Sequence, residues 1–255
     1  MSAPLSSPID LKNKRAVVIG GGGDIGKAII KAFAREGAQV TIADIIDTSN
    51  IVQEIEQMGG KAFSYVSDVT NETQIDGLRD FVINKMGGAD ILAYVAGVMH
   101  VTRLEELTLE EWNRDLNINL TGALLHCRTF LPLMKKQGSG KIIFIGSIAA
   151  KIGGMHSGPH YSASKGGVHS LMKWIARDGA PDGVYVNCIA PGPLEIGGKV
   201  GMAPSSSGTI SPESSPLGRL GKPEDIAEAA VFLTSPASNW ITGSVLDVNG
   251  GILMD

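Results

Sequence analysis

Residues 16–27 read AVVIGGGGDIGK, and this stretch decides the fold of the chain. Four apolar residues form a β-rich run, four glycines follow, and an apolar–polar pattern typical of a helix begins at Ile25. A glycine-rich turn that enters a helix N-terminus offers backbone N–H groups and a favourable dipole to a phosphate, because no side chain obstructs the approach. The turn therefore predicts a nucleotide-phosphate site in the first strand–helix unit. Its expected members are Gly20, Gly23, Asp24, Ile25 and Gly26.

The alternation of strand and helix continues along the whole chain. Strands are expected at 16–19, 40–43, 62–66, 91–95, 142–145, 184–189 and 245–248, and helices at 25–36, 71–85, 110–134, 161–178 and 223–233. Such alternation is typical of parallel strands joined by right-handed crossovers. We predict an α/β fold with a doubly wound, Rossmann-type parallel sheet of about seven strands and helices on both faces. Ligands of such sheets bind beyond the carboxyl ends of the strands.

The domain organisation is simple. Residues 1–10 are rich in Ser and Pro and read as a flexible N-terminal tail, and residues 11–255 fit a single domain. Residues 194–216 interrupt the rhythm with six serines, four glycines and three prolines. A stretch of this kind is expected to be a substrate lid or a disordered loop, and its place after a strand on the ligand side favours the lid.

Composition excludes several classes of function. The net charge of −4 has mixed signs and no basic stripe, so nucleic acid is not an expected partner. The chain contains no apolar run long enough for a membrane span, and its N-terminus lacks the pattern of a signal peptide. Cys127 and Cys188 lie in apolar contexts and are expected to be buried free thiols, which indicates a reducing compartment. We therefore expect a cytoplasmic protein.

A carboxylate at the end of the second strand predicts the choice of cofactor. Asp44 would accept hydrogen bonds from the adenosine ribose hydroxyls and repel a 2′-phosphate, and neither Ile45 nor Gly23 offers a cation for that phosphate. The alternative is an exposed Asp at a strand end that contacts nothing. The first interpretation favours NAD over NADP. Asp68 and Val69 end the third strand on the same rim and are expected to contact the adenine.

A tyrosine and a lysine stand four positions apart in the segment YSASK at 161–165, on one face of a predicted helix. A phenol has a pKa near 10 and is a poor base at neutral pH, but a neighbouring ammonium favours the phenolate. The pair would serve as an acid–base couple, although the spacing on its own is common and favours a surface contact between Tyr and Lys. Ser147 follows the fifth strand at the ligand rim, and Asn119 interrupts an apolar helix within the segment NINLTG at 117–122.

Taken together, these motifs resemble the short-chain dehydrogenases/reductases of the single-domain type, from about Leu11 to the C-terminus. The glycine turn, Asn-x-x-Gly, the rim Ser and Tyr-x-x-x-Lys recur in the family's order, as do VNCIAPG at 186–192 and the tail from ITG at 241–243 to NGG at 249–251.

The resemblance implies a role for each residue of the catalytic set. Tyr161 would be the acid–base residue, and Lys165 would lower its pKa and hold the nicotinamide ribose. Ser147 would orient the substrate oxygen, and Asn119 would hold a water that joins Lys165 to solvent. Asn187 would brace the backbone of the active site. Further cofactor contacts implied by position are Ala96, Gly97, Pro191, Gly192 and Leu194, in addition to Tyr161 and Lys165.

The implied activity is an NAD(H)-dependent interconversion of a secondary alcohol and its ketone, and the family's habit implies a homodimer or homotetramer. One alternative is a 3-oxoacyl thioester reductase; NADPH use and a basic rim would favour it, and Asp44 and the acidic charge disfavour it. A nucleotide-binding regulator without catalysis is a third possibility, which the complete catalytic set disfavours.

Five positions depart from the family's pattern. Ile19 replaces a Thr, Asp24 replaces the middle Gly of the turn, and Ile196 replaces a Thr after the Pro-Gly turn. Tyr94-Val95 stands where the family has Asn-Asn, so Tyr94 is expected either to replace the lost hydrogen bonds or to pack as an apolar side chain.

The substrate pocket is expected to be apolar with a few polar groups. Beside Ser147, its expected members are His100, Met155, His156, His160 and Met202. Solvated loop histidines are the favoured reading, with substrate hydrogen bonding as the alternative. No metal is expected, because the chain has no His-x-x-x-His helix and no evident carboxylate partner for these histidines.

Overall fold

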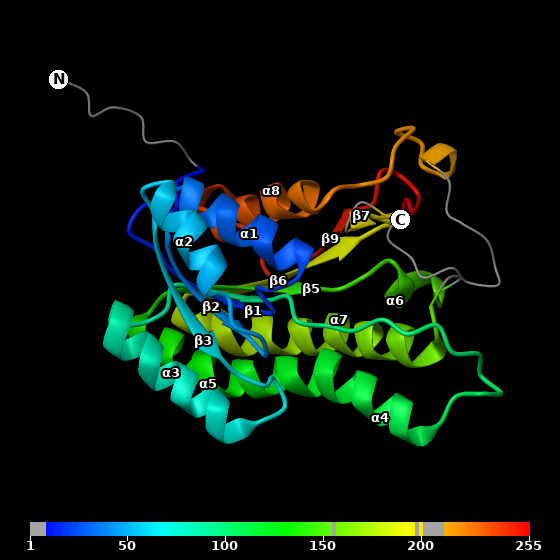
Figure 1. Cartoon of the computed structure of the whole chain (residues 1–255), viewed down its shortest axis with the longest axis horizontal. Coiled ribbons are helices and arrows are strands. Elements are labelled where there is room, and N and C mark those ends of the chain that lie inside the picture. The colour runs from blue at the N-terminus through cyan, green and yellow to red at the C-terminus, as the bar shows by residue number, and fades with distance from the viewer. Residues whose placement is uncertain (1–8, 155–156, 197–198, 201–211) are drawn as a thin grey trace.

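Strand β1 (Arg15–Ile19) lies inside a seven-stranded parallel sheet in the order β3-β2-β1-β4-β5-β6-β9 (Figure 1). The structure is a computed structural model that describes residues 9–154, 157–196, 199–200 and 212–255. The other strands of the sheet are β2 (Gln39–Asp44), β3 (Lys61–Val66), β4 (Ile91–Tyr94), β5 (Gly140–Ile145), β6 (Val184–Pro191) and β9 (Val245–Val248). The predicted doubly wound sheet is confirmed, and each strand begins and ends within two residues of its expected bounds.

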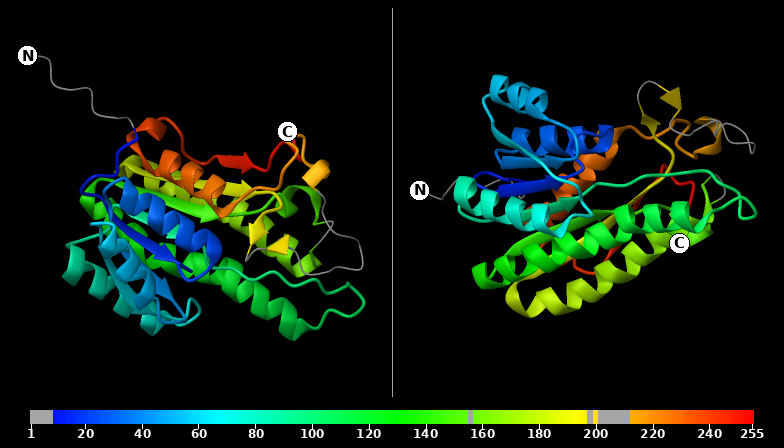
Figure 2. Two further views of the ribbon diagram at one scale, coloured as in Figure 1. Left: turned by 45° about the horizontal axis from the view of Figure 1, so that its top comes forward. Right: turned by 60° about the horizontal axis from the view of Figure 1, so that its bottom comes forward.

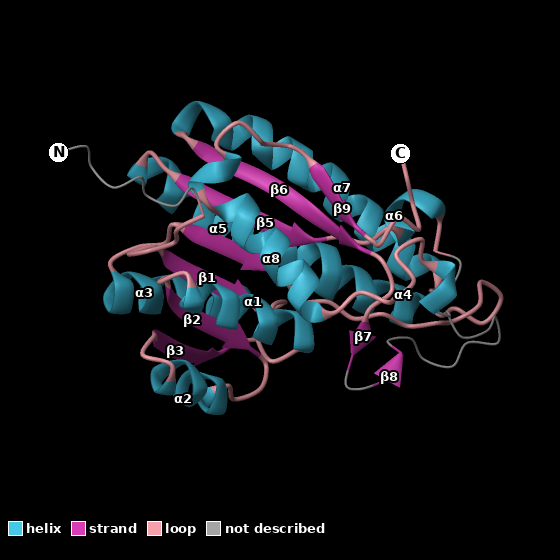
Figure 3. Cartoon of the chain, turned by 90° about the horizontal axis from the view of Figure 1, so that it is seen from above, coloured by secondary structure: helices cyan, strands magenta, loops and turns pink. Residues whose placement is uncertain are grey.

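Helices cover both faces of the sheet, as Figures 1 and 3 show. One layer contains α1 (Asp24–Arg35), α2 (Ser49–Gln57) and α8 (Pro223–Thr234), and the other contains α3 (Glu72–Met86), α4 (Leu109–Leu116), α5 (Gly122–Gln137) and α7 (Pro159–Gly179). Because alternate strand residues point to opposite faces, Val18 packs in the core beneath α1 and α8, whereas Val17 packs in the core beneath α5 and α7. Both faces are therefore buried, which explains the continuous apolar strands.

The long helix expected at 110–134 is interrupted. Between α4 and α5 the chain makes a π-helical turn over Asn117–Thr121, and this turn contains Asn119. The remaining short elements are α6 (Ala149–Ile152) and three 3₁₀ turns, at Ala180–Asp182, Pro212–Ser214 and Pro236–Ser238. A π-helical turn widens the helix by one residue and is common at functional sites.

The expected loop at 194–216 contains local structure in its described part. Strands β7 (Glu195–Ile196) and β8 (Lys199–Val200) pair antiparallel beside the sheet's carboxyl edge (Figure 2). Leu194 and Gly221 form a bridge, and the Gly221 N–H donates to the Pro193 carbonyl at 3.1 Å. The described ends of the segment are therefore ordered, whereas residues 201–211 lie outside the described part of the chain, and the substrate lid stays a prediction.

Cys127 and Cys188 are both buried and unbonded to another sulfur, as predicted. In the described ranges no helix combines the length and the apolar character that a membrane crossing requires.

Candidate active site

The glycine-rich turn packs so tightly that two of its glycines cannot be replaced. Gly20 has φ of +85°, and a Cβ there would lie 2.5 Å from the backbone of Ala96. A Cβ on Gly26 would lie 2.3 Å from the Gly20 carbonyl oxygen. Asp24 begins α1 in ordinary helical geometry, so the departure at this position is tolerated by the backbone. These contacts bring the start of α1 directly against the end of β1.

The start of α1 is open to a ligand. Its N-cap, Gly23, has no side chain to accept a hydrogen bond from the first turn, so the N–H groups of that turn keep their capacity to bind an anion. The turn lines a cavity of about 560 Å³ at the carboxyl edge of the sheet. Residues predicted to bind the cofactor that line this cavity are Gly20, Gly23, Asp24, Ile25, Gly26, Asp44, Asp68, Val69, Ala96 and Gly97.

Asp44 is held in place at the wall of this cavity. Its carboxylate accepts the Gly22 N–H at 2.8 Å and the Ile46 N–H at 3.1 Å. The alternative of a strand-end Asp that contacts nothing is therefore wrong. Arg114 is the only arginine or lysine among the described residues that line the cavity, and the sequence analysis missed it. Its guanidinium also lies near Asp115, with Nε 3.5 Å from Oδ1.

A second cavity of about 250 Å³ adjoins the first. The two share five wall residues, namely Ile25, Val95, Gly97, Val98 and Ile196. Its other walls include Ser147, Tyr161, Lys165, Pro191, Gly192 and Leu194, all of which the sequence analysis selected, and Met99 and Ile148, which it did not. The two adjoining cavities thus lie at the carboxyl edge of the sheet, between strand ends and the starts of α1, α6 and α7.

Tyr161 and Ser147 face each other across the second cavity. Both hydroxyl side chains line this cavity, and Ser147 Oγ accepts the Ala149 N–H at 3.1 Å. Burial raises the pKa of the Tyr161 phenol above its usual value, and the hydrogen bond to Ser147 lowers it in part. The phenol is therefore a half-buried, neutral proton donor at neutral pH.

Lys165 lies below the Tyr161 ring. Its Nζ is 5.7 Å from the ring centroid and donates to the Ile145 carbonyl at 2.8 Å. Burial lowers the pKa of Lys165 to about 8. Burial and Ser147 are the causes of the Tyr161 pKa shift, and the lowering of that pKa by Lys165 stays a prediction.

The π-helical turn places Asn119 next to Lys165. The Asn119 carboxamide exchanges two hydrogen bonds with the backbone of Val98, at 2.8 and 3.0 Å, and its Nδ2 also donates to Ser164 Oγ at 2.9 Å. A Cβ built on Gly97 would lie 3.2 Å from Asn119 Oδ1 and 3.3 Å from Lys165 Nζ. The glycine therefore permits the close approach of the two polar side chains.

Ser164 was quoted in the YSASK segment without a role, and the structure gives it one. Its hydroxyl donates to the Tyr161 carbonyl at 2.7 Å while it accepts from Asn119. It therefore links the π-helical turn to α7. The only hint in the sequence was the position of this serine, directly before the lysine.

Tyr94 replaces the hydrogen bonding of the family's Asn. Its hydroxyl donates to the Ile118 carbonyl at 2.5 Å, inside the π-helical turn. Asn187 acts elsewhere: its side chain donates to the Ile241 carbonyl and accepts the Ser244 N–H, so it joins β6 to the segment before β9. Asn187 lines neither of the two cavities.

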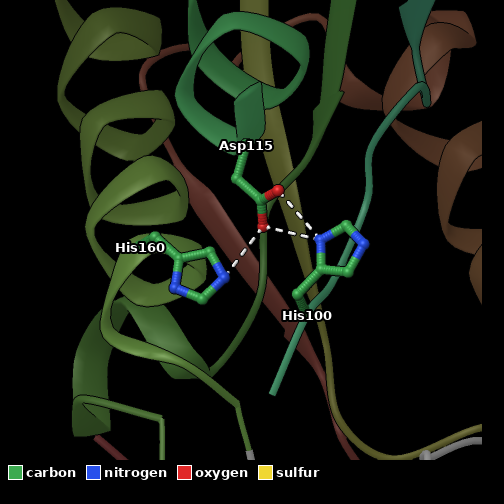
Figure 4. Close-up of side chains that lie close together, drawn as sticks. All are labelled: His100, Asp115 and His160. Atoms are coloured by element: carbon green, nitrogen blue, oxygen red, sulfur yellow. Dashed lines mark hydrogen bonds and ion pairs between the residues drawn. The ribbon is translucent and has the colours of Figure 1, made fainter. Parts of the chain in front are cut away.

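The predicted substrate histidines lie apart from the cavity. His100 and His160 turn toward the buried carboxylate of Asp115, and neither lines the cavity around Tyr161 (Figure 4). The favoured reading of solvated histidines is wrong for His160, which is fully buried, and these histidines do have a carboxylate partner. Asp115 escaped notice because it is remote from both in sequence. Met155, His156 and Met202 lie outside the described residues.

Comparison with known proteins agrees with this architecture. A family model described as enoyl-(acyl carrier protein) reductase matches residues 22–253. The 7alpha-hydroxysteroid dehydrogenase of Escherichia coli (strain K12) is 35% identical, with 96% of each chain covered. The 3-oxoacyl-[acyl-carrier-protein] reductase FabG of Thermotoga maritima is 34% identical, with 96% of this chain and 99% of that protein covered.

Solved structures match closely as well. A short-chain type dehydrogenase/reductase from Mycobacterium marinum superposes with a TM-score of 0.90 at 32% identity, covering 98% of this chain and 100% of that chain. A 7 alpha-hydroxysteroid dehydrogenase complexed with NADH and 7-oxo glycochenodeoxycholic acid gives 0.86 at 33% identity, with 97% of each chain covered. With the glycine turn, the paired hydroxyls and the buried lysine assembled at one edge of the sheet, this chain belongs to the short-chain dehydrogenase/reductase family.

Proposed function

We propose that this protein is an NAD(H)-dependent oxidoreductase that interconverts a secondary alcohol and its ketone. The Ser147 and Tyr161 side chains support the proposal most directly, because both line a pocket that continues the cavity of the glycine turn. Two hydroxyls on one side of a pocket are the groups that a carbonyl or alcohol oxygen needs for orientation and proton transfer. The relative solved with NADH and a 7-oxo compound is consistent with this chemistry.

The residues present fit a nicotinamide dinucleotide. The uncapped first turn of α1 would hold the pyrophosphate, and Asp44 would hold the adenosine ribose. Asp68 and Val69 would contact the adenine, while Lys165 and Tyr161 would hold the nicotinamide ribose. The positions Ala96, Gly97, Pro191, Gly192 and Leu194 would form the walls. Once bound, the nicotinamide supplies the hydride acceptor for oxidation and the hydride donor for reduction.

The chain's own part is the movement of a proton. Ser147 would form a hydrogen bond with the substrate oxygen and hold that oxygen against Tyr161. In the reduction, the Tyr161 hydroxyl would give its proton to the ketone oxygen. In the oxidation, it would take the proton from the alcohol. Lys165 carries the pKa, about 8, that a relay near neutral pH requires. Asn119 stands beside Lys165 and would hold a water that continues the relay to solvent.

Asp44 supports NAD as the preferred form of the cofactor. Two backbone N–H groups hold its carboxylate in the cavity, where it would repel a 2′-phosphate. Arg114 lies on the wall of the same cavity, and a bound 2′-phosphate would need an ion pair with its guanidinium. We assign preference to NAD because the carboxylate is fixed, whereas the guanidinium is half exposed and already faces Asp115.

The test is turnover by purified protein with NAD and a panel of secondary alcohols, with Tyr161→Phe as the variant. Tyr161→Phe is expected to abolish turnover while it still binds NADH. Tyr185→Phe is the matched control, because Tyr185 lies near Lys141, distant from either cavity wall. Full activity in Tyr161→Phe would refute the proposed mechanism. Binding of NADH without turnover of any substrate would instead support the nucleotide-binding regulator.

A second candidate is a 3-oxoacyl thioester reductase, favoured by the 34% identity with the Thermotoga maritima reductase. It would require reduction of a 3-oxoacyl thioester, with NADPH as the expected donor. The relative affinities of NADH and NADPH, followed by turnover of such a thioester against a secondary-alcohol panel, separate the two candidates.

The proposal extends to assembly and location. A homodimer or homotetramer would bury apolar side chains that α5 and α7 expose, notably Leu124 at 45% and Trp174 at 64%. Two free buried thiols fit a reducing, cytoplasmic setting. Light scattering of the purified chain tests the assembly; a monomer at all concentrations would contradict it.

A further inference from the structure

Three segments that are far apart in the sequence meet around one buried carboxylate (Figure 4). Asp115 comes from α4 and is fully buried. His100 comes from the segment after β4, and His160 comes from the first turn of α7, directly before Tyr161. No step of the proposed reaction uses these three side chains. Their arrangement therefore calls for an explanation of its own.

The donor atoms have the spacing of a metal site. Asp115 Oδ2 lies 3.1 Å from His100 Nδ1 and 3.2 Å from His160 Nε2, and one ligand atom from each residue lies within 4.8 Å of the other two. Ligands about 2.0–2.2 Å from a tetrahedral zinc ion are roughly 3.3–3.5 Å apart. Both carboxylate–imidazole distances already approach this value. Only the two imidazoles need to move closer together.

His160 has an unused ligand atom. The side chain is fully buried, and neither of its ring nitrogens makes a hydrogen bond of good geometry, although Nε2 faces the Asp115 carboxylate. A buried polar atom without a partner costs about 1–3 kcal/mol. Coordination of a metal by Nε2 would remove that cost. His100, with 40% of its side chain exposed, gives an ion a route from solvent.

One arginine of the described part of the chain lies beside the cluster. Arg114 Nε lies 3.5 Å from Asp115 Oδ1 and is the cation that opposes a metal ion there. Its side chain is 47% exposed, so the guanidinium can turn toward water when the carboxylate binds an ion. Two neutral imidazoles and one carboxylate are a donor set suited to zinc and to the neighbouring first-row ions.

We propose that His100, Asp115 and His160 bind one divalent transition-metal ion of the zinc type, with solvent at the remaining position. The ion ties the segment after β4 and α4 to the first turn of α7. The Gly158 N–H already donates to the His100 carbonyl at 2.9 Å, so the backbone holds two of the three ligands in register. The ion would therefore stabilise the wall of the pocket on which Met99 and Tyr161 lie.

The experiment uses the full chain without a histidine tag, stripped with a chelator and titrated with Zn²⁺ and with Co²⁺. We expect one equivalent of either ion, visible d–d absorption bands with Co²⁺, and a higher Tm with Zn²⁺. His100→Asn and His160→Gln are the decisive variants. Their amide nitrogens take the places of Nδ1 and Nε2 and keep a hydrogen-bond donor toward Asp115, but they are poor zinc ligands. Each is expected to weaken binding at least tenfold.

The matched control is His126→Asn, which replaces a buried histidine of α5 whose Nδ1–H donates to the Gly122 carbonyl at 2.8 Å. It is expected to bind metal as the unaltered chain does. Absence of saturable binding of one equivalent would overturn the proposal and leave a hydrogen-bonded cluster. Binding that survives unchanged in both His100→Asn and His160→Gln would also overturn it, because the ion would then lie elsewhere. Neither outcome bears on Tyr161, whose function is tested separately.

Discussion

The hydroxyl of Tyr94 donates a hydrogen bond of 2.5 Å to the carbonyl oxygen of Ile118, the second residue of the π-helical turn. A wider turn breaks the regular ladder of backbone hydrogen bonds and leaves a carbonyl that needs a partner. Tyr94, at the end of β4, supplies that partner from the sheet. The position of Asn119, next in sequence to Ile118, thus depends on a tyrosine where the family has an asparagine.

We predict that Tyr94→Phe lowers the free energy of unfolding by about 1–3 kcal/mol, because the Ile118 carbonyl would be buried without a donor. We also predict a lower kcat, since Asn119 loses its fixed position. Urea unfolding and steady-state kinetics measure the two effects. Unchanged stability would show that water replaces the hydroxyl at no cost.

Gly97→Ala is expected to reduce activity at least tenfold while the protein stays folded. The added methyl group would lie 3.2 Å from Asn119 Oδ1 and 3.3 Å from Lys165 Nζ and would push the two apart. Gly166→Ala is the matched control in α7, since nothing lies within 4 Å of its Cβ. That control is expected to keep its activity and to gain about 0.4–1 kcal/mol of stability. Equal activity in both variants would contradict the proposed role of the Asn119–Lys165 approach.

Asp44→Asn is expected to weaken NADH binding. It is also expected to lower the ratio of NADH affinity to NADPH affinity by roughly tenfold to a hundredfold. Hydrogen bonds to a charged group contribute about 1.5–3 kcal/mol, and the amide removes the charge that would repel a 2′-phosphate. The amide oxygen still accepts one of the two backbone N–H groups. Fluorescence titration with each cofactor measures the ratio. A ratio unchanged from that of the parent chain would mean that Asp44 does not select the cofactor.

Burial lowers the pKa of His126 to about 4, and burial likewise lowers the pKa of His169 to about 4. Both imidazoles are therefore neutral in the folded protein and become protonated more readily on unfolding. The stability that this provides is complete above pH 6.5 and is lost as the pH falls toward 4. The expected slope is at most about 1.4 kcal/mol per pH unit for each histidine. His126→Asn should remove the contribution of one histidine to the dependence of the free energy of unfolding on pH, measured by denaturant unfolding between these pH values.

Much of the fold could be read from the sequence because its determinants are local. The continuous apolar strands and the glycine turn at 20–26 depend on neighbours in the chain, and both appear where expected. Tyr161, Lys165 and Ser147 could be selected because each stands at a strand end or a helix start on one edge of the sheet. The same reasoning identified Asp44. One of the two backbone N–H groups that it accepts belongs to Gly22 in the glycine turn, and the other belongs to Ile46, two residues after Asp44.

Other features depend on contacts between distant segments. A helical pattern does not reveal the extra residue of the π-helical turn, because apolar spacing on either side continues almost unchanged. The pairing of Asp115 with His100 and His160 depends on how α4 packs against α7, and a buried carboxylate in an otherwise polar helix gave no hint of it. The raised pKa of Tyr161 also follows from three-dimensional burial, whereas the spacing of Tyr and Lys suggested the opposite direction.

Leu194 and Gly221 are bridged, and the backbone bonds beside them close the intervening segment at its base. The free energy needed to bring the ends of a loop together grows slowly with its length, by about 0.6 kcal/mol for each doubling. A change in the length of the span between these two residues would therefore alter the free energy of closing it only slightly. Transplanting the corresponding span of a relative should change substrate preference and leave Tm nearly unchanged only if the graft keeps the buried side chains of Ser215 and Leu220; an unchanged substrate preference would contradict a role of the span in selectivity. Relatives could then differ in their substrates through this span alone, while Ser147, Tyr161 and Lys165 stay unchanged.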